Sequence, residues 1–330
     1  MVCMEIANAL VVAPSEPDQG PWPTAPSTPR VLFPVANRPI LAHCLDWLSA
    51  AGVPAARVVV IPEDHRAVED ALDAGARTDM AVQLATYDPA AGLAGALADA
   101  EVLAGDEPLI VVRGDAVIRD GLRAHLTRFG RGGLDALLLQ LSDAAPRDPA
   151  VGYVLTPEAR FVLAARQGIA ASPRQRLEAR GASVDVVHVR GVLATIGGQE
   201  TLLAANREAL ERMTPGGADV AADDCIIQGP ALIDPTATVT STTLRGPLVL
   251  GARAVVTESY IGPYTAIGDD VVLEGVEIEH SIVLADAALR FIGRRLESSV
   301  IGRRARVGRS FQPPGAFRLS LGEDSEVDLA

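Results

Sequence analysis

The residues most informative about chemistry lie in segment 13–40, which follows an apolar run, 6–12, that predicts a buried strand. A loop at a strand end is where an active site would lie. The first half of the segment is rich in proline, which has no amide hydrogen to donate to a phosphate. Glu16 and Asp18 add negative charge, which repels phosphate. Arg30 could supply the positive charge that such a ligand requires.

The net charge of the chain argues against nucleic-acid binding. The formal net charge is −13 and the isoelectric point is about 4.9, so a polyanionic nucleic acid would be repelled. We therefore expect small-molecule or protein partners. All 29 basic residues are arginine, so every cationic contact must come from a planar guanidinium and none from a compact ammonium.

Cysteine content and hydropathy indicate the compartment. Cys3, Cys44 and Cys225 are odd in number and widely spaced, which predicts reduced thiols in the cytoplasm and no zinc site. The longest apolar runs are far shorter than the roughly 20 residues that span a bilayer, so no membrane association is expected. Glu5 interrupts the N-terminus and no basic leader precedes it, so no signal peptide is expected.

Apolar strands and helices alternate through the first part of the chain. Pro39 and Gly52 mark the ends of a predicted helix whose apolar residues begin at Ile40. The alternation predicts a Rossmann-like α/β domain, with a parallel sheet covered on both faces and a ligand crevice at the C-terminal ends of its strands. The expected strands are 58–61, 82–85, 109–112, 136–141 and 184–189, and the expected helices are 65–72, 93–103 and 122–129.

From residue 226 onward an apolar residue recurs at every fifth or sixth position, with Gly or Pro between. Such a repeat is typical of a left-handed parallel β-helix, in which the recurring residue points into the coil. We therefore expect an α/β domain over 1–215 and a β-helix over 216–330. The recurring residues are Ile227, Ile233, Val239, Leu244, Leu250, Val255, Ile261, Ile267, Val272, Ile278 and Val283.

Four segments carry a resemblance to a known family. They are residues 29–40, 202–207, 261–268 and 319–329. On these segments the chain resembles the sugar-1-phosphate nucleotidylyltransferases, above all the long glucose-1-phosphate thymidylyltransferases of actinobacteria. The resemblance implies a reaction in which a sugar 1-phosphate and a nucleoside triphosphate give a nucleoside-diphosphate sugar and pyrophosphate, with Mg²⁺ as cofactor if the protein is active.

The same resemblance implies a set of site residues. Arg30 takes the place of the family's first lysine, and Asp115 matches the carboxylate that holds Mg²⁺ in those enzymes, so these two are the expected catalytic residues. A Gly-Asp pair after a strand is also an ordinary turn, and that alternative stays open. The expected nucleotide-binding residues are Ala13, Pro14, Tyr87, Gly92 and Gly114.

Several positions depart from the family pattern. The family's Gly-Gly-x-Gly-Thr-Arg loop becomes Ala13-Pro14 and a proline-rich stretch, and Tyr87 stands near the place of the base-reading glutamine. Thr195 replaces the second Mg²⁺ carboxylate, and a hydroxyl is a poor substitute for an anion. Arg166 lies where the second lysine would fall, without the residues that frame that lysine. The segment that would form the sugar pocket is also short.

These departures lead to three hypotheses. The first is a family member with weak or lost activity, a pseudoenzyme that serves as a nucleotide-binding or regulatory subunit. It would form a homo-oligomer, or a hetero-oligomer with an active paralogue, through the β-helix. The alternative is an active nucleotidylyltransferase with an altered site or an unusual substrate. The third is an acyltransferase that uses His280 as its base, although no supporting motif surrounds this histidine.

A basic cluster in the β-helix contrasts with the acidic chain. It could bind an anionic ligand or an acidic face of a neighbouring subunit, or it could occupy outward positions of the β-helix. Its members are Arg290, Arg294, Arg295, Arg303, Arg304, Arg306 and Arg309.

Overall fold

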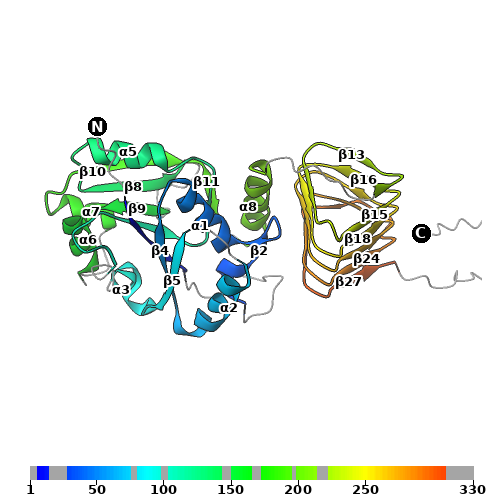
Figure 1. Ribbon diagram of the computed structural model, residues 1–330, viewed down its shortest axis with the longest axis horizontal. Coiled ribbons are helices and arrows are strands. Elements are labelled where there is room, and N and C mark those ends of the chain that lie inside the picture. Colours follow the sequence, from blue (N-terminus) through cyan, green and yellow to red (C-terminus); the bar gives the residue numbers. More distant parts are fainter. Residues whose placement is uncertain are drawn as a thin grey trace, which may run out of the picture.

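The computed structural model describes residues 6–14, 28–75, 80–97, 103–142, 150–165, 172–194, 198–213 and 222–309. An α/β unit is followed by a column of stacked strands, and helix α8 (Gln199–Glu211) stands between the two (Figure 1). The expected order, a Rossmann-like unit and then a β-helix, is confirmed.

A seven-stranded sheet forms the centre of the α/β unit, in the order β10-β8-β9-β6-β1-β4-β5. β1 is parallel to β4 and β6, β4 to β5, and β8 to β10. β9 is antiparallel to both β6 and β8, so the sheet is mixed where a fully parallel sheet was expected. The strands are β1 (Asn8–Val12), β4 (Ala55–Val60), β5 (Ala81–Thr86), β6 (Leu109–Arg113), β8 (Ala136–Leu141), β9 (Gly152–Leu155) and β10 (Val184–Val189).

Helices cover both faces of this sheet, because successive residues of each apolar strand point to opposite sides. Val58 packs in a cluster with residues of α1, α2 and α5, whereas Val59 packs with residues of α3, α6 and α7. No helix in the described parts of the chain has the length and apolar character needed to cross a bilayer. The helices are α1 (Ile40–Ala50), α2 (His65–Gly75), α3 (Gly92–Ala96), α5 (Arg123–Arg131), α6 (Pro157–Ala164) and α7 (Pro173–Glu178).

Short elements complete the α/β unit. β2 and β3 form a tight hairpin whose turn residues, Ala36 and Asn37, have positive φ angles of 48° and 61°. β7 and β11 form an antiparallel pair beside the main sheet. The elements are η1 (Arg30–Leu32), β2 (Pro34–Val35), β3 (Arg38–Pro39), η2 (Pro62–Asp64), η3 (Pro89–Ala91), β7 (Ala116–Ile118) and β11 (Gly191–Leu193).

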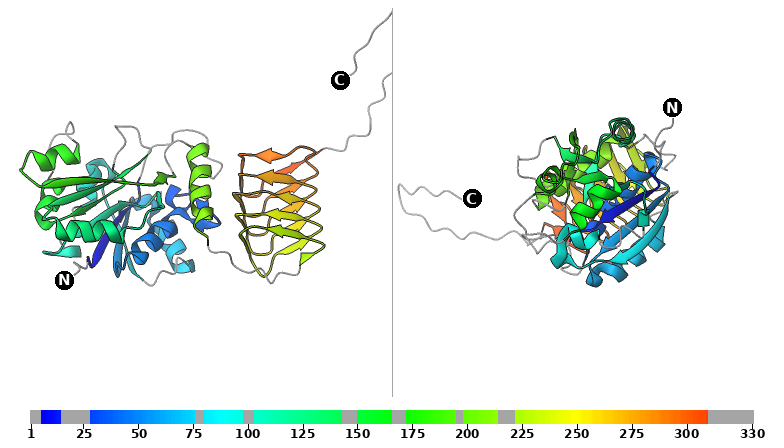
Figure 2. Two further views of the ribbon diagram at one scale, coloured as in Figure 1. Left: turned by 90° about the horizontal axis from the view of Figure 1, so that it is seen from above. Right: turned by 90° about the vertical axis from the view of Figure 1, so that its left-hand side faces the viewer.

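The β-helix has three faces, each a sheet of parallel strands, and its coils stack along one axis (Figure 2). The first face contains β12 (Ala222–Asp223), β15 (Thr238–Thr240), β18 (Val255–Thr257), β21 (Val272–Glu274), β24 (Ala288–Arg290) and β27 (Arg306–Gly308). The second contains β13 (Ile226–Gln228), β16 (Thr243–Arg245), β19 (Tyr260–Ile261), β22 (Glu277–Glu279) and β25 (Leu296–Glu297). The third contains β14 (Ala231–Ile233), β17 (Leu248–Leu250), β20 (Thr265–Ile267), β23 (Ile282–Val283) and β26 (Val300–Ile301).

Three of the residues predicted to point into the β-helix are not buried in it. Val256 and Leu273 are fully buried, whereas Val255 is 38% exposed and Val272 is half-buried. Val255 and Val272 are each followed by an apolar residue, and because neighbouring strand residues point to opposite sides, only the second residue of each pair faces inward. Ile227, in the first coil of its face, is also 39% exposed.

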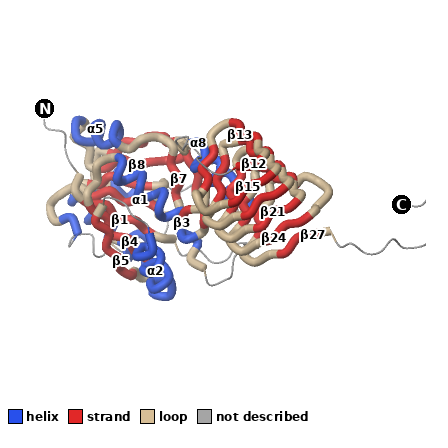
Figure 3. Tube along the Cα trace, turned by 45° about the vertical axis from the view of Figure 1, so that its right-hand side comes forward, coloured by secondary structure: helices blue, strands red, loops and turns tan. Residues whose placement is uncertain are grey.

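The two units share an apolar cluster, so they are packed against each other and not merely tethered. Phe33 and Val35 from the α/β unit join Leu202 of α8 and the β-helix residues Val249 and Leu284 in this cluster. Figure 3 shows α8 and β3 at the junction between the two units, and the Gln199 side chain at the start of α8 donates to the Ser298 carbonyl near the last coils of the β-helix.

Candidate functional site

The expected site residues follow neighbouring strands at one edge of the sheet. Ala13 comes directly after β1, Tyr87 after β5, and Gly114 after β6. The Ala13 amide donates to the Val59 carbonyl at 2.9 Å, and the Gly114 amide donates to the Val12 carbonyl at 2.8 Å. Because these strands are parallel, their C-terminal ends meet at this edge, where an open α/β sheet binds its ligand.

Tyr87 and Ala13 are joined directly. The Tyr87 hydroxyl donates to the Ala13 carbonyl at 3.1 Å, and the Tyr87 amide donates to the Val60 carbonyl at 3.0 Å. The phenol is thereby held against the backbone after β1. Pro14, the next residue, is half-buried and has no amide hydrogen to donate. The ends of β1 and β5 therefore present an aromatic ring to a ligand but few hydrogen-bond donors.

Gly92 begins α3 with a φ angle of +55°, which only glycine adopts without strain, and it is exposed. The preceding turn is capped by Asp88, whose Oδ1 accepts a hydrogen bond from the Ala90 amide at 3.0 Å. A Cβ atom on Gly95 would lie 2.6 Å from the Asp88 carbonyl oxygen. The glycines of this segment are therefore required by the backbone itself. The predicted helix 93–103 ends as α3 at Ala96, and residues 98–102 lie outside the described parts.

Asp115 is fully buried and ion-paired with Arg113. The Arg113 Nε donates to Asp115 Oδ1 at 2.9 Å, and its Nη2 donates to Oδ2 at 2.8 Å. The Asp115 side chain is 0% exposed and that of Arg113 is 18% exposed. Such a two-point contact engages both carboxylate oxygens. Gly114, between the two residues, allows close packing, since a Cβ atom there would lie 3.2 Å from Val11 Cγ1.

Two neutral groups flank this ion pair. The Cys44 thiol donates to the Arg113 carbonyl at 3.6 Å, and burial, together with the charge of Asp115, raises the pKa of this thiol above its usual range. Burial also raises the pKa of Tyr153 to about 12, although the charge of Arg113 opposes that shift. Both groups therefore stay protonated at neutral pH.

The segment that the family resemblance aligns with the second metal carboxylate lies beside Asp115. The Ala194 amide donates to the Asp115 carbonyl at 3.0 Å, and β11 pairs with β7, the strand directly after Asp115. Thr195 itself lies outside the described residues, as do Arg166, Cys3 and segments 15–27 and 319–329.

The described residues fit a magnesium ion poorly. Mg²⁺ requires oxygen ligands at near-octahedral positions, whereas both carboxylate oxygens of Asp115 accept hydrogen bonds from Arg113. Across the described ranges, no group of three His, Cys, Asp or Glu side chains is placed to hold a metal ion. We therefore derive no chemical step through a metal on Asp115.

Arg30 begins η1 and is half-buried. Its neighbour Val31 is 2% exposed and packs in the same apolar cluster as Ala13 and Leu41. This packing fixes the backbone of Arg30 relative to the end of β1. A cation at this position is suited to an anionic ligand at the end of β1.

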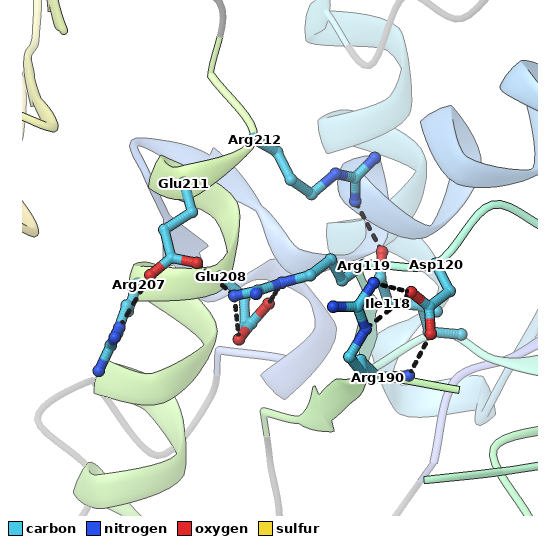
Figure 4. A network of polar contacts seen from close by, with 8 residues as sticks. All are labelled: Ile118, Arg119, Asp120, Arg190, Arg207, Glu208, Glu211 and Arg212. Carbon is cyan, nitrogen blue, oxygen red and sulfur yellow. Dashed lines mark hydrogen bonds and ion pairs between the residues drawn. The ribbon is translucent and has the colours of Figure 1, made fainter. Parts of the chain in front are cut away.

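A polar network anchors β7 to α8 (Figure 4). The Arg119 Nε and Nη2 donate to the two carboxylate oxygens of Glu208 at 2.7 and 2.8 Å, and Nη2 also contacts Glu211. Arg212 donates to the Ile118 carbonyl at 2.9 Å. The strand after Asp115 is therefore held by the helix that contacts the β-helix.

The same network continues to β10 and β11 through Asp120. Arg190 donates from its amide to Asp120 Oδ2 at 2.8 Å and from Nε to Oδ1 at 2.9 Å. These hydrogen bonds lower the pKa of the Asp120 carboxyl. The carboxylate thus ties the turn after β7 to Arg190, the residue between β10 and β11.

Asn206 of α8 joins the α/β unit to the β-helix. It is completely buried, its Oδ1 accepts a hydrogen bond from the Ala36 amide at 2.9 Å, and its Nδ2 donates to the Tyr264 carbonyl at 2.9 Å. Asn37 Nδ2 donates to the Ile267 carbonyl at 2.6 Å. The β2–β3 hairpin, which follows Arg30, is thereby fixed to both α8 and the β-helix.

The remaining candidates lie in the β-helix. The ring of His280 lies 5.0 Å from that of Tyr264, in a tilted arrangement. Members of the basic cluster occupy outward positions and pair in part with acidic residues: Arg290 lies 3.5 Å from Glu274, and Arg303 lies 3.5 Å from Asp286. These contacts favour the interpretation of the cluster as an outward surface.

Arg113 is the functional residue that the sequence analysis missed. It ends an otherwise apolar strand, β6, and lies two residues before the expected metal carboxylate. A cation at that spacing was a detectable signal, because a guanidinium so near a buried acid will pair with it.

Comparison with known proteins identifies relatives over nearly the whole chain. A family model described as "Nucleotidyl transferase" matches residues 22–162. Glucose-1-phosphate thymidylyltransferases of Streptomyces antibioticus and Streptomyces griseus are each 28% identical, over 344 and 341 residues that cover 93% of this chain and 95% and 96% of those proteins. A low-salt glycan biosynthesis nucleotidyltransferase of Haloferax volcanii is 26% identical over 347 residues, 93% of this chain and 96% of that protein.

Proposed function

Because the chain belongs to the sugar-1-phosphate nucleotidylyltransferase family, we propose that it is a relative with weak or lost transferase activity that acts as a nucleotide-binding or regulatory subunit. The observation that carries this proposal is the state of Asp115. At the strand end where a metal carboxylate was expected, the side chain is buried in an ion pair with Arg113.

The crevice keeps features that suit a nucleotide. The ends of β1, β5 and β6 are tied together through Ala13, Tyr87 and Gly114, and Gly92 opens α3 close to Tyr87 in the chain. The Tyr87 ring offers a face on which a base can stack, but its hydroxyl is engaged by Ala13. We therefore expect nucleotide binding with little discrimination among bases.

Transfer chemistry needs more fixed charge than this site offers. Nucleotidyl transfer depends on positioning and on cations that stabilise the charge of the reacting phosphate. The chain has no lysine, and the Arg113–Asp115 pair has no net charge. Loss of one stabilising contact typically costs about 10²- to 10³-fold in rate. Several such losses leave weak turnover or none.

The active-enzyme alternative rests on Arg30. The residue is half-buried and directly precedes Val31, which packs in the same apolar cluster as Ala13, so a cation here would suit a phosphate at the end of β1. An altered or unusual substrate would then be transferred without the family's usual arrangement of charges.

We further propose a cytoplasmic protein that forms homo-oligomers, or hetero-oligomers with an active paralogue, through its β-helix. Exposed apolar side chains in the first coils, among them Ile226 at 56% and Leu232 at 47%, suit such a contact. Light scattering after size-exclusion chromatography would test this. A monomer at all concentrations, alone and with a paralogue, would contradict it.

Calorimetry with dTTP, UTP and ATP, followed by a pyrophosphate-release assay with glucose 1-phosphate, tests the main proposal. We expect binding of at least one nucleotide without appreciable turnover. Tyr87→Ala should weaken binding because it removes the ring, whereas Tyr87→Phe, which keeps the ring and loses only the bond to Ala13, should bind nearly as well. Binding with rapid turnover would support the active-enzyme alternative, and no binding of any nucleotide would contradict both.

A further inference from the structure

We propose that the Arg113 guanidinium takes, from within the chain, the place of a divalent cation on Asp115, so that the crevice accepts a nucleotide in its metal-free form. The part of this inference that concerns the nucleotide rests on the proposed function. The part that concerns the cation does not, because it follows from the geometry of the ion pair alone.

The geometry leaves a metal ion no ready position on the carboxylate. Both oxygens of Asp115 accept from Arg113, at 2.9 and 2.8 Å, and the aspartate side chain has no exposed surface. Because the carboxylate is completely enclosed, a divalent cation with its other ligands would reach either oxygen only by displacing the guanidinium. Breaking a buried ion pair leaves an uncompensated charge, so displacement is strongly unfavourable.

The surroundings hold the arginine in place. Gly114 is tied to β1 by its amide, and the Arg113 carbonyl accepts from the buried Cys44 thiol at 3.6 Å. The Asp115 carbonyl accepts from the Ala194 amide. The backbone on each side of the pair is therefore anchored to a different element: β1, α1 and the end of β11.

The net charge of the Arg113–Asp115 pair differs from that of a metal bound to a carboxylate. A magnesium ion on one carboxylate carries a net charge of +1 toward a phosphate, whereas the Arg113–Asp115 pair carries none. A magnesium ion brought by the nucleotide would gain no ligand from Asp115. Metal binding to the nucleotide therefore should not strengthen its binding to this protein.

Manganese binding measured by electron paramagnetic resonance tests the cation part, because Mn²⁺ takes the same oxygen ligands and its free form is observed directly. We expect wild type and Asp115→Asn to bind Mn²⁺ equally weakly. Arg113→Gln, which keeps a hydrogen-bond donor for the buried carboxylate, should gain one site that binds Mn²⁺ several-fold more tightly than wild type does, with water completing the shell of the ion. The double variant Arg113→Gln with Asp115→Asn should lose that site.

Two further variants serve as controls. Arg113→Lys keeps a positive charge beside Asp115 and should still exclude Mn²⁺. Arg253→Gln disrupts an arginine–aspartate pair of the same two-point geometry on the β-helix surface, with Asp270, and should create no tight site. Folding of each variant is checked by circular dichroism.

The inference is overturned if wild type binds one Mn²⁺ that Asp115→Asn loses, or if Arg113→Gln gains no site. Nucleotide affinity is then measured with EDTA and with Mg²⁺. Equal or tighter binding in EDTA is expected, and a requirement for Mg²⁺ would contradict the metal-free form. Absence of nucleotide binding in both conditions would contradict the proposed function while leaving the manganese result intact.

Discussion

Two arginine–aspartate pairs in this protein have almost the same geometry and different surroundings. Arg113 meets Asp115 through two contacts at the end of β6, with the aspartate fully buried. Arg253 meets Asp270 through two contacts at 2.7 and 2.6 Å on the exterior of the β-helix, where both side chains are exposed. Water screens the second pair, so only in the first should removal of one partner leave a costly unpaired charge.

A double-mutant cycle compares the two pairs. We expect a coupling free energy of about 1–3 kcal/mol between Arg113 and Asp115 in urea unfolding of Arg113→Gln, Asp115→Asn and the double variant. The matched cycle at Arg253 and Asp270 should give a clearly smaller value. Equal coupling at the two places would show that burial does not strengthen the Arg113 pair.

His43 predicts a dependence of stability on pH. Its Nε2 lies 2.8 Å from the Val35 carbonyl, to which the ring donates, and burial lowers the pKa of His43 although that hydrogen bond opposes the shift. Below about pH 6.5 His43 is protonated in the unfolded chain but stays neutral in the folded protein until a lower pH. The contribution of His43 is therefore complete above that pH and is lost as the pH falls.

The measurement is urea unfolding at pH 7.5 and pH 5.5. His43→Gln should lose less stability between these values than wild type, because it removes one group that binds protons preferentially in the unfolded state. A His43→Gln profile parallel to that of wild type would contradict this assignment.

At the scale of secondary structure, α8 and the β2–β3 hairpin connect the site to the rest of the molecule. α8 contacts the end of β7 through Arg119 and Glu208, and it contacts the hairpin and the β-helix through Asn206. Positions of Asp115 and Arg30 are therefore linked to the β-helix by short chains of hydrogen bonds.

Removal of the central contact should have a measurable cost. Asn206→Ala leaves the Ala36 amide and the Tyr264 carbonyl buried without this partner, so we expect a loss of about 2–3 kcal/mol in the free energy of unfolding. Gln199→Ala removes an exposed bond from the same helix to the Ser298 carbonyl and should cost much less. Equal losses in the two variants would show that Asn206 has no special part in the junction.

Elements with strong local signals were predicted well, and those set by distant contacts were not. Pro39 gave the start of α1, and the apolar runs gave β4, β6 and β8 within a few residues. The direction of β9 depends on its connection and not on its own four residues. Val255 and Val272 were placed inward because a doublet of apolar residues does not reveal which member faces the core.

The candidate site was predicted in part for a similar reason. The meeting of Ala13, Tyr87 and Gly114 follows from parallel strands ending at one edge, which the alternating pattern implies. The engagement of Asp115 by Arg113 depends on side-chain geometry and burial, which sequence spacing suggests but does not fix.

At the scale of the whole molecule, the two units depend on each other for burial. Leu284 of the β-helix is 3% exposed and packs with Phe33, Val35 and Leu202 from the other side of the junction. These apolar side chains would meet water if the units separated. The β-helix thus contributes to the packing of the α/β unit.

A charge in this junction should therefore destabilise the protein. Leu284→Asp places a carboxylate among apolar side chains and should cost at least about 3 kcal/mol of stability in thermal and urea unfolding. Leu232→Asp, at a β-helix position that is 47% exposed, is the control and should change stability little. Similar stability of the two variants would mean that the junction contributes little to folding.

If the proposed function is right, the neutral, buried Arg113–Asp115 pair leaves this protein unable to transfer nucleotidyl groups efficiently. The most direct test is the rate of nucleoside-diphosphate-sugar formation from dTTP and glucose 1-phosphate at saturating Mg²⁺. We predict a kcat below about 10⁻² s⁻¹, against roughly 1–10³ s⁻¹ for typical enzymes. A kcat in that typical range, abolished in Asp115→Asn, would contradict the proposed loss of transferase activity.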